Sequence, residues 1–266
     1  MEAPARLVAL SRWAADRLVA DPGAAAALAD LDVAIDPAGA IDVDHLARCY
    51  EREMLRLAAR DLGGIDDLTA TTRAISTAAA ALWEAALRLA GAPELAVIGM
   101  GKLGAGELNY ASDVDVVLVA ADPAGAEPAA RRAAALVRHS VPVDLALRPG
   151  GGGGVLLRTV AGYVAHWERW AAPWERQALL KARPVAGDPA LGAAWAEAAE
   201  RALWDRPFGA DDIRAIRAMK RRAEAEVARR GTSDRDLKRG LGGIRDIELA
   251  VQLLQLVHGR DDPALR

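Results

Sequence analysis

Cysteine is almost absent from this sequence, and its scarcity excludes several classes of protein. The 266 residues contain one cysteine, Cys49, so no disulfide can form within the chain. The four histidines are scattered without the spacing of zinc ligands, namely His45, His139, His166 and His258. A disulfide-stabilised domain and a structural zinc module are therefore excluded, and we expect a protein of the reducing cytoplasm.

Long apolar runs and a strong net charge are also missing. No apolar stretch reaches the length of about 18 residues that a membrane-spanning helix needs, and residues 1–18 carry acids and arginines where a signal peptide has an apolar core. Lys and Arg number 34 against 37 Asp and Glu, a net charge of -3. We therefore expect neither export, nor a membrane, nor a nucleic-acid partner.

Helical periodicity dominates the first third of the chain. In Val43–Asp61, apolar residues recur at spacings of three and four, which predicts an amphipathic helix. A second helix is expected from Asp67 to a capping Gly91, with Pro93 blocking its continuation. Residues 1–92 are thus expected to form an N-terminal helical region.

The middle of the chain changes to strand patterns. Apolar or alternating runs at Leu95–Ile98, Val114–Ala120 and Val141–Arg148 predict three strands, with a helix at residues 124–138. The five glycines Gly150–Gly154 predict a flexible loop. Helical signals return from Thr159 onward. The expected fold class is α+β, with a core at 93–158 and a helical domain at 159–266.

A glycine motif follows the first strand. Gly99, Gly101 and Gly104 spell G-x-G-x-x-G, which at first sight is a dinucleotide-binding fingerprint. However, only about eight residues separate Gly104 from Asp113, which is too few for the crossover helix of such a unit, and the acidic residues open the next strand instead of closing it. We therefore reject NAD binding.

The glycine loop is better combined with carboxylates. Asp113 and Asp115 lie two residues apart on an expected strand, so their side chains share one face. Asp144 would add a third carboxylate from a neighbouring strand. Such a set suits Mg²⁺ and phosphoryl chemistry, with the loop amides from Gly101 to Gly104 facing phosphate groups at the start of a short helix.

An acidic pair of this spacing is weak evidence by itself. Asp42 with Asp44 and Asp234 with Asp236 repeat it, the first where a helix N-cap is wanted, for which we favour Asp44, and the second in a polar loop. A solvated strand edge is the corresponding alternative for Asp113 and Asp115. The order of strand, glycine loop, acidic pair and third acidic strand favours the metal interpretation.

Charged residues outside this core allow two interpretations. A helical stretch carries five basic residues followed by Glu224 and Glu226, namely Arg214, Arg217, Lys220, Arg221 and Arg222. A solvated face with ion pairs four residues apart is favoured, and contact with a nucleotide or an acidic partner surface is the alternative. Lys181 and Arg183 are further candidate phosphate or adenylate contacts.

Several strings of the sequence resemble one known family. Gly101-Lys102 followed by Asp113-Val114-Asp115 resembles the nucleotidyltransferase core shared with DNA polymerase beta, and the string from Ala96 to Val119 resembles the bifunctional glutamine synthetase adenylyltransferase and adenylyl-removing enzymes. Similar strings occur up to the helix ending near His258. The resemblance covers most of residues 45–266, and ELNYASDVDV is more similar to the adenylyl-removing half of that family.

The resemblance implies roles for particular residues. Asp113, Asp115 and Asp144 would be the catalytic, metal-binding carboxylates. The candidate nucleotide-binding residues are Gly99, Gly101, Lys102, Gly104, Ser112 and Arg148, although the Ser112 hydroxyl is better placed to hydrogen-bond its own loop. This sequence departs from the family in three ways. Gly150–Gly154 stands where the family has basic and polar residues, and fewer residues separate Val119 from Asp144 than in the family. The family's helical domain also continues beyond the helix at 244–258. We therefore expect a truncated domain.

The expected activity is removal of AMP from an adenylylated tyrosine of glutamine synthetase. No residue in the glycine and acidic strings forms a base-and-nucleophile pair, which favours inorganic phosphate as attacker, held near Lys102 and Arg148, with ADP as product. ATP-dependent adenylylation of the same tyrosine is one alternative, and an inactive domain that only binds glutamine synthetase is another. The resemblance also implies regulation through a PII signalling protein.

Overall fold

The computed structural model describes residues 3–231 and 235–266. The chain divides into two compact units, which we call the sheet unit and the helical unit. The sheet unit comprises the chain up to Val160 together with Lys181–Ala196, and the helical unit comprises Ala161–Leu180 and Glu197–Arg266. Among the described residues, no helix is both long and apolar enough to cross a membrane.

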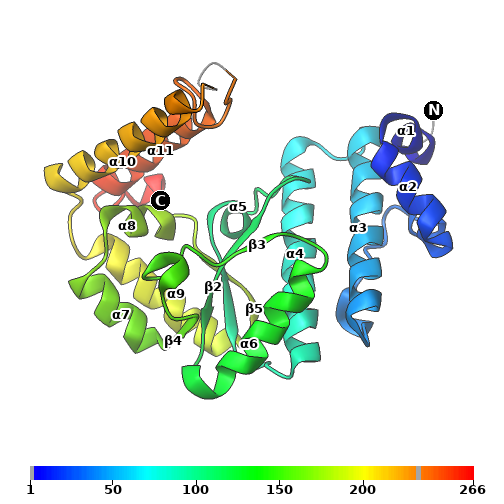
Figure 1. Cartoon of the computed structure of the whole chain (residues 1–266), viewed down its shortest axis with the longest axis horizontal. Coiled ribbons are helices and arrows are strands. Elements are labelled where there is room, and N and C mark those ends of the chain that lie inside the picture. Colours follow the sequence, from blue (N-terminus) through cyan, green and yellow to red (C-terminus); the bar gives the residue numbers. More distant parts are fainter. Residues whose placement is uncertain (1–2, 232–234) are drawn as a thin grey trace. The chain divides into compact units, whose positions relative to one another are not determined.

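The sheet unit contains the five strands and the N-terminal helices (Figure 1). Its helices are α1 (Ala3–Leu10), α2 (Arg12–Ala20), α3 (Val43–Gly63), α4 (Leu68–Ala90), α5 (Gly101–Ala105) and α6 (Pro123–Arg138), with short 3-10 turns η1 (Pro22–Leu28), η2 (Pro37–Gly39) and η3 (Gly151–Gly153). Its strands are β1 (Ala96–Gly99), β2 (Val114–Val119), β3 (Val143–Asp144), β4 (Leu157–Arg158) and β5 (Arg183–Gly187).

Capping residues set the ends of the two long helices. Asp42 caps α3 by accepting a hydrogen bond from the His45 amide at 2.7 Å, and Asp67 caps α4 in the same way. Gly91 ends α4 in the left-handed conformation. The predictions of both helices and of the Gly91 cap are confirmed. The predicted N-cap Asp44 is wrong, because Asp42 caps α3. Asp234, of the second repeated pair, lies outside the described residues.

The sheet has the order β3-β2-β1-β5, with β4 also paired to β2. β1 runs antiparallel to both β2 and β5, whereas β3 and β4 run parallel to β2. The α+β fold class is therefore confirmed. The predicted third strand is reduced to Val143–Asp144, because the Asp144 carboxylate accepts a hydrogen bond from the Ala146 amide at 2.6 Å and turns the chain.

The predicted domain boundaries differ from the observed units. Residues 1–92 and 93–158 fall in one unit, and β5, from the segment expected to be helical, adds an edge strand to the same sheet. The sequence does not predict β5, because its five residues include Pro184 and Gly187 and read as a break between helices.

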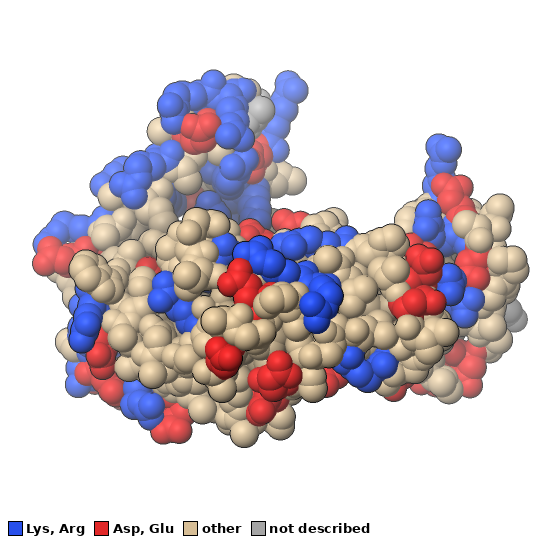
Figure 2. All heavy atoms as spheres, turned by 60° about the horizontal axis from the view of Figure 1, so that its bottom comes forward, with Lys and Arg blue, Asp and Glu red and all other residues tan. Residues whose placement is uncertain are grey.

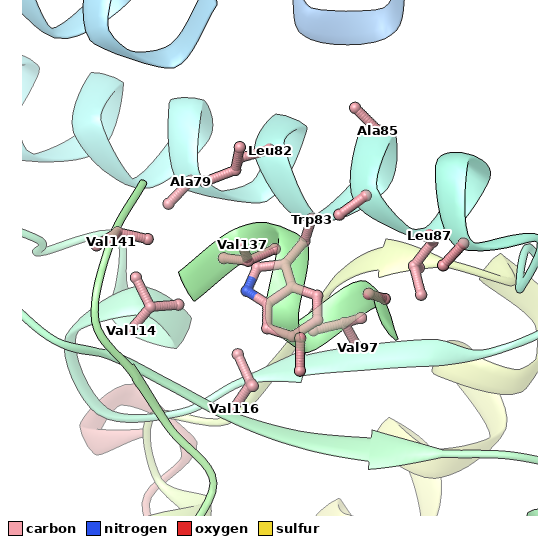
Figure 3. Packing of buried hydrophobic residues seen from close by; sticks show 14 of the residues in the cluster. Ala79, Leu82, Trp83, Ala85, Leu87, Val97, Val114, Val116, Val137 and Val141 are labelled. Atoms are coloured by element: carbon pink, nitrogen blue, oxygen red, sulfur yellow. The ribbon is translucent and has the colours of Figure 1, made fainter. Parts of the chain in front are cut away.

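The core of the sheet unit lies between the sheet and its helices. Trp83 from α4 is completely buried and lies above Val97 and Val116 of the central strands, beside Val137 of α6 (Figure 3). A second cluster, which contains Leu7 and Leu55, joins α1 to α3. Val114, Val116 and Leu118 supply the core face of β2, so alternation directs Asp113 and Asp115 to the other face.

The helical unit consists of α7 (Val160–Arg169), α8 (Pro173–Leu179), the second part of α9 (Pro189–Trp204), α10 (Ala210–Arg229), α11 (Ile244–His258) and the short turn η4 (Pro263–Leu265). Arg176 of α8 is buried, and its guanidinium donates to the carbonyl oxygens of Leu203 and Arg206, both at 2.6 Å. These hydrogen bonds attach α8 to the chain that leads from α9 to α10.

Candidate functional site

The candidate site begins at the start of β2. Asp113 is exposed immediately before the strand, and Asp115 is partly buried at its second position. β3 is paired to β2 in parallel register, with Asp144 directly across from Asp115. Neighbouring strands lie about 4.8 Å apart and paired residues share a face. The backbone thus brings the carboxylates of Asp115 and Asp144 to adjacent positions on one face.

The turn from β1 into α5 borders these carboxylates. The Met100 amide donates to the Asp115 carbonyl oxygen at 2.8 Å. Gly101 has a φ of +50°, and a Cβ atom there would lie 2.9 Å from Oδ2 of Asp115. Glycine is therefore favoured at 101 both by its backbone conformation and by the space beside the carboxylate.

The other two glycines of the motif serve packing. A Cβ atom on Gly104 would lie 1.8 Å from the Lys181 carbonyl oxygen, and one on Gly99 would lie 2.9 Å from the Val185 side chain. The Gly104 amide donates to the Met100 carbonyl oxygen at 3.2 Å, so it is not available to a phosphate group. The expectation of phosphate-facing amides is thus wrong for Gly104, and Gly99 lies on the core face of β1.

Lys102 and Ser112 come together beside the acidic pair. Lys102 Nζ lies 3.4 Å from Ser112 Oγ, and Ser112 accepts a hydrogen bond from the Asn109 amide at 3.1 Å. The Ser112 hydroxyl also donates to Asn109 Oδ1 at 2.9 Å. The prediction that Ser112 hydrogen-bonds its own loop is confirmed, and the loop holds it in the position before Asp113.

Arg148 is engaged by the backbone of the glycine-rich loop. Its guanidinium donates to the carbonyl oxygens of Leu145, Gly152 and Gly154. The run Gly150–Gly154, which we expected to be a flexible loop, contains the 3-10 turn η3 enclosed by these hydrogen bonds. In this conformation Arg148 shapes the loop, and its donors are not directed to a phosphate.

Three contacts that sequence reasoning missed fix the loop between α5 and β2. The Leu108 amide donates to Ser76 Oγ of α4 at 3.0 Å, and the Tyr110 hydroxyl donates to Asp61 of α3 at 3.0 Å. Glu107 forms an ion pair with Lys181 at 2.6 Å. Partial burial and this hydrogen bond to Asp61 raise the pKa of Tyr110, which remains a neutral donor.

Lys181 and Arg183, the further candidate phosphate contacts, both lie near the glycine turn. Lys181 contacts the acidic Glu107, and its carbonyl oxygen covers Gly104. Arg183 is exposed on β5 and is paired with Gly99. These positions belong to the sheet unit, so the segment after Leu180 returns to the site region although it follows two helices of the other unit.

The donor set has the chemistry of a magnesium site, but its side chains do not converge on one point. Carboxylate oxygens are the ligands that Mg²⁺ prefers, and the missing Cβ of Gly101 leaves space at Oδ2 of Asp115. Within the described residues, no group of three or more His, Cys, Asp or Glu side chains lies close enough together to hold a metal ion. The backbone therefore positions the ligands that a bound ion would have to draw together.

This arrangement defines the class of nucleotidyltransferases. It consists of a small mixed sheet, a glycine turn, an acidic pair at the start of the next strand, and a third carboxylate in register beside that pair. The family model described as Glutamate-ammonia ligase adenylyltransferase matches residues 5–198. The chain belongs to this family. A second model, GlnD PII-uridylyltransferase, matches residues 217–265.

Curated relatives agree with the family model. Proteins named bifunctional glutamine synthetase adenylyltransferase/adenylyl-removing enzyme match from Streptomyces coelicolor, with 45% identity over 254 residues, and from Mycobacterium tuberculosis, with 44% identity over 240 residues. The matches cover 86% and 84% of this chain, and 25% and 24% of the relatives. The chain thus spans about a quarter of the length of the curated relatives that it matches.

Proposed function

We propose that this chain removes AMP from an adenylylated tyrosine of glutamine synthetase by magnesium-dependent phosphorolysis, with ADP as product. The proposal depends above all on one observation, the register that puts Asp144 of β3 beside Asp115 of β2. Membership of the family supports glutamine synthetase as the substrate, because the relatives carry it in their names. The likeness of residues 107–116 to the adenylyl-removing half favours removal.

In this proposal the three aspartates would hold Mg²⁺, which would neutralise charge on the phosphate that is transferred. Inorganic phosphate is already an anion, so no general base is needed. One of its oxygens bonds to the phosphorus of AMP while the bond from that phosphorus to the tyrosine oxygen breaks. The phenolate leaves with the electron pair and is protonated, and the proton comes overall from the attacking hydrogen phosphate, which becomes the terminal phosphate of ADP. The pKa of about 10 of the tyrosine hydroxyl makes its phenolate a moderately good leaving group.

Lys102 supplies the cation that we assign to the phosphate. Its Nζ lies 3.4 Å from Oγ of Ser112, the residue that precedes Asp113. Arg148 would have to release its carbonyl partners before it could bind phosphate, so we assign it the support of the Gly150–Gly154 loop. Of the three glycines in the motif, we assign only Gly101 to nucleotide binding.

The test is the identity of the nucleotide released. Adenylylated glutamine synthetase is incubated with the protein, Mg²⁺ and inorganic phosphate, and the nucleotides are separated. ADP that requires phosphate and is lost in Asp115→Asn supports the proposal. Asp16→Asn, at an exposed site on α2, is the matched control and should be fully active. AMP formed without phosphate would mean that water attacks.

ATP-dependent adenylylation of the same tyrosine is the second candidate function, favoured by the word adenylyltransferase in the names of the family and its relatives. Pyrophosphate released from ATP in the presence of unmodified glutamine synthetase would identify it. An inactive domain that only binds glutamine synthetase would show neither reaction and no Mg²⁺-dependent rise in melting temperature.

Regulation and location extend the proposal. A PII signalling protein is our candidate regulator, supported by the match of residues 217–265 to a model whose description contains PII. A cytoplasmic location agrees with the single cysteine. A pull-down of purified PII protein by the chain, with and without glutamine, tests this regulation directly.

A further inference from the structure

Residues 109–112 form a turn that leads directly into Asp113. The Ser112 amide donates to the Asn109 carbonyl oxygen at 3.1 Å, which closes the turn. The Asn109 side chain accepts hydrogen bonds from the Ala111 amide at 3.0 Å and from the Ser112 hydroxyl at 2.9 Å. Asn109 therefore organises the turn with both its backbone and its side chain.

The chemistry of these groups fixes the direction of each hydrogen bond in the turn. A backbone amide can only donate, so the Asn109 side-chain atom that faces the Ala111 amide is the oxygen. The Ser112 hydroxyl therefore donates its single proton to that oxygen. Its two lone pairs accept from the Asn109 amide, at 3.1 Å, and from Nζ of Lys102, at 3.4 Å. Ser112 thus presents an acceptor to the Lys102 ammonium because Asn109 takes the hydroxyl proton.

The residues on either side of Asn109 are attached to the two long helices. The buried Leu108 amide donates to Ser76 Oγ of α4, and the Tyr110 hydroxyl donates to Asp61 of α3, both at 3.0 Å. The turn is therefore fixed to α3 and α4 on both sides of Asn109.

A cation that is held in place matters here because the protein as a whole does not attract anions. The net charge of the chain is -3, and Asp and Glu lie among Lys and Arg on the face drawn in Figure 2. An ammonium group has three donors, and the hydrogen bond to Ser112 uses one, which leaves two for phosphate oxygens. The lysine stem is flexible, so a contact that restricts Lys102 in advance lowers the entropic cost of binding phosphate.

We propose that Asn109 is a positioning residue, which orients the Ser112 hydroxyl and thereby holds Lys102 in place for the attacking phosphate. The identity of that anion rests on the proposed function, whereas the hydrogen bonds that hold Lys102 do not. Asn109 contacts neither metal nor substrate in this inference and acts only through Ser112. Without the Asn109 side-chain oxygen, the Ser112 hydroxyl is free to rotate, and Lys102 loses a fixed acceptor.

The kinetic test is a double-mutant cycle on the whole chain. Asn109→Ala and Ser112→Ala should each raise the KM for inorganic phosphate in ADP formation about fivefold, with a much smaller effect on kcat, because each loosens the cation that binds phosphate. The double variant should also show an increase of about fivefold, because both changes remove the same interaction. An increase of about 25-fold would show that Asn109 acts independently of Ser112, which overturns the proposal.

The second test observes Lys102 directly and needs neither Mg²⁺ nor substrate. The chain has four lysines, so NMR order parameters of their ε-methylene groups can be assigned one by one with arginine substitutions. These lysines are Lys102, Lys181, Lys220 and Lys238. We expect Lys102 to be more ordered than the exposed Lys238, and Asn109→Ala to lower its order to the level of Lys238. The signals of the other lysines report whether the same sample is folded.

Asp36→Ala is the matched control for both tests. The exposed Asp36 side chain accepts a hydrogen bond from the amide two residues further on, at 2.9 Å, as Asn109 does. This variant should change neither the KM for phosphate nor the order of Lys102. Unchanged order of Lys102 in a folded Asn109→Ala protein overturns the proposal. AMP formed without phosphate would contradict the proposed function alone, and the order of Lys102 would then decide the role of Asn109.

Discussion

At the scale of single residues, the placement of two carboxylates matters most. Asp115 and Asp144 are register partners on parallel strands, so each should contribute a charge to the same metal ion. We expect Asp115→Asn and Asp144→Asn each to lower the rate of ADP formation by at least about a hundredfold, with an unchanged circular dichroism spectrum. Activity retained in both variants would remove this site from the proposed function.

The glycines of the turn allow a second prediction. Alanine at 104 would place Cβ 1.8 Å from a backbone oxygen, so Gly104→Ala should lower the free energy of unfolding by about 3 kcal/mol or more. Alanine at 101 meets only the end of the Asp115 side chain and a left-handed backbone, at a cost of roughly 1–2 kcal/mol.

Denaturant unfolding of the two glycine variants checks this difference. Gly101→Ala should remain folded but lose ADP formation, because its Cβ displaces the Asp115 carboxylate. A Gly104→Ala protein as stable as the unsubstituted chain would show that α5 does not pack as described.

At the scale of elements, ion pairs attach the N-terminal segments to α3. Arg52 holds Asp21 at the start of η1 at 2.6 Å, and Arg60 holds Asp66, just before α4, at 2.7 Å. These guanidinium groups keep the pKa of both carboxyl groups below the ordinary value. The carboxylates are partly exposed, so solvent reduces what each pair contributes.

The lowered pKa values predict acid sensitivity. Because the folded carboxyl groups hold their protons less tightly than those of the unfolded chain, the unfolded state binds more protons as the pH falls from about 5 towards 3, and the free energy of unfolding decreases. Asp21→Asn with Asp66→Asn should be less stable at pH 7 and should lose less stability over that range.

Urea unfolding at pH 7, 5 and 3.5 measures this effect, with the exposed Asp16→Asn as control. Equal losses of stability in the double variant and in the unsubstituted chain would contradict the assignment of acid sensitivity to these two pairs.

At the scale of the whole molecule, the sheet depends on a strand from late in the chain. β5 pairs with β1, the Gly187 amide donates to Glu84 of α4 at 2.7 Å, and the Asp188 amide donates to the Leu95 carbonyl oxygen at 2.8 Å. A chain that ends at 158 would leave the edge of β1 and part of α4 without these partners.

We therefore expect residues 1–196 to give a soluble protein with a cooperative thermal transition, and residues 1–158 to aggregate or unfold without one. Circular dichroism melting and size-exclusion chromatography of the two fragments measure the difference. If residues 1–158 melt as cooperatively and at the same temperature as residues 1–196, β5 is dispensable.

Local signals in the sequence were enough for the long helices, the central strand and the family. Asp67 and Gly91 mark the ends of α4 through caps that involve only neighbouring backbone groups, and β2 is a continuous apolar run. The acidic pair at its start was visible for the same reason, since residues two apart on a strand share a face whatever surrounds them.

Only the tertiary structure decided which distant segments meet. The register that puts Asp144 opposite Asp115, the addition of β5 to the sheet and the hydrogen bond from Tyr110 to Asp61 join residues far apart in sequence, and no local pattern fixes these contacts. The sequence predicted only that Asp144 lies on a neighbouring strand. Arg148 could be read as a phosphate ligand until its guanidinium was found on three loop carbonyls. Backbone and side-chain propensities act over a few neighbouring residues, whereas these contacts depend on how buried surfaces fit together.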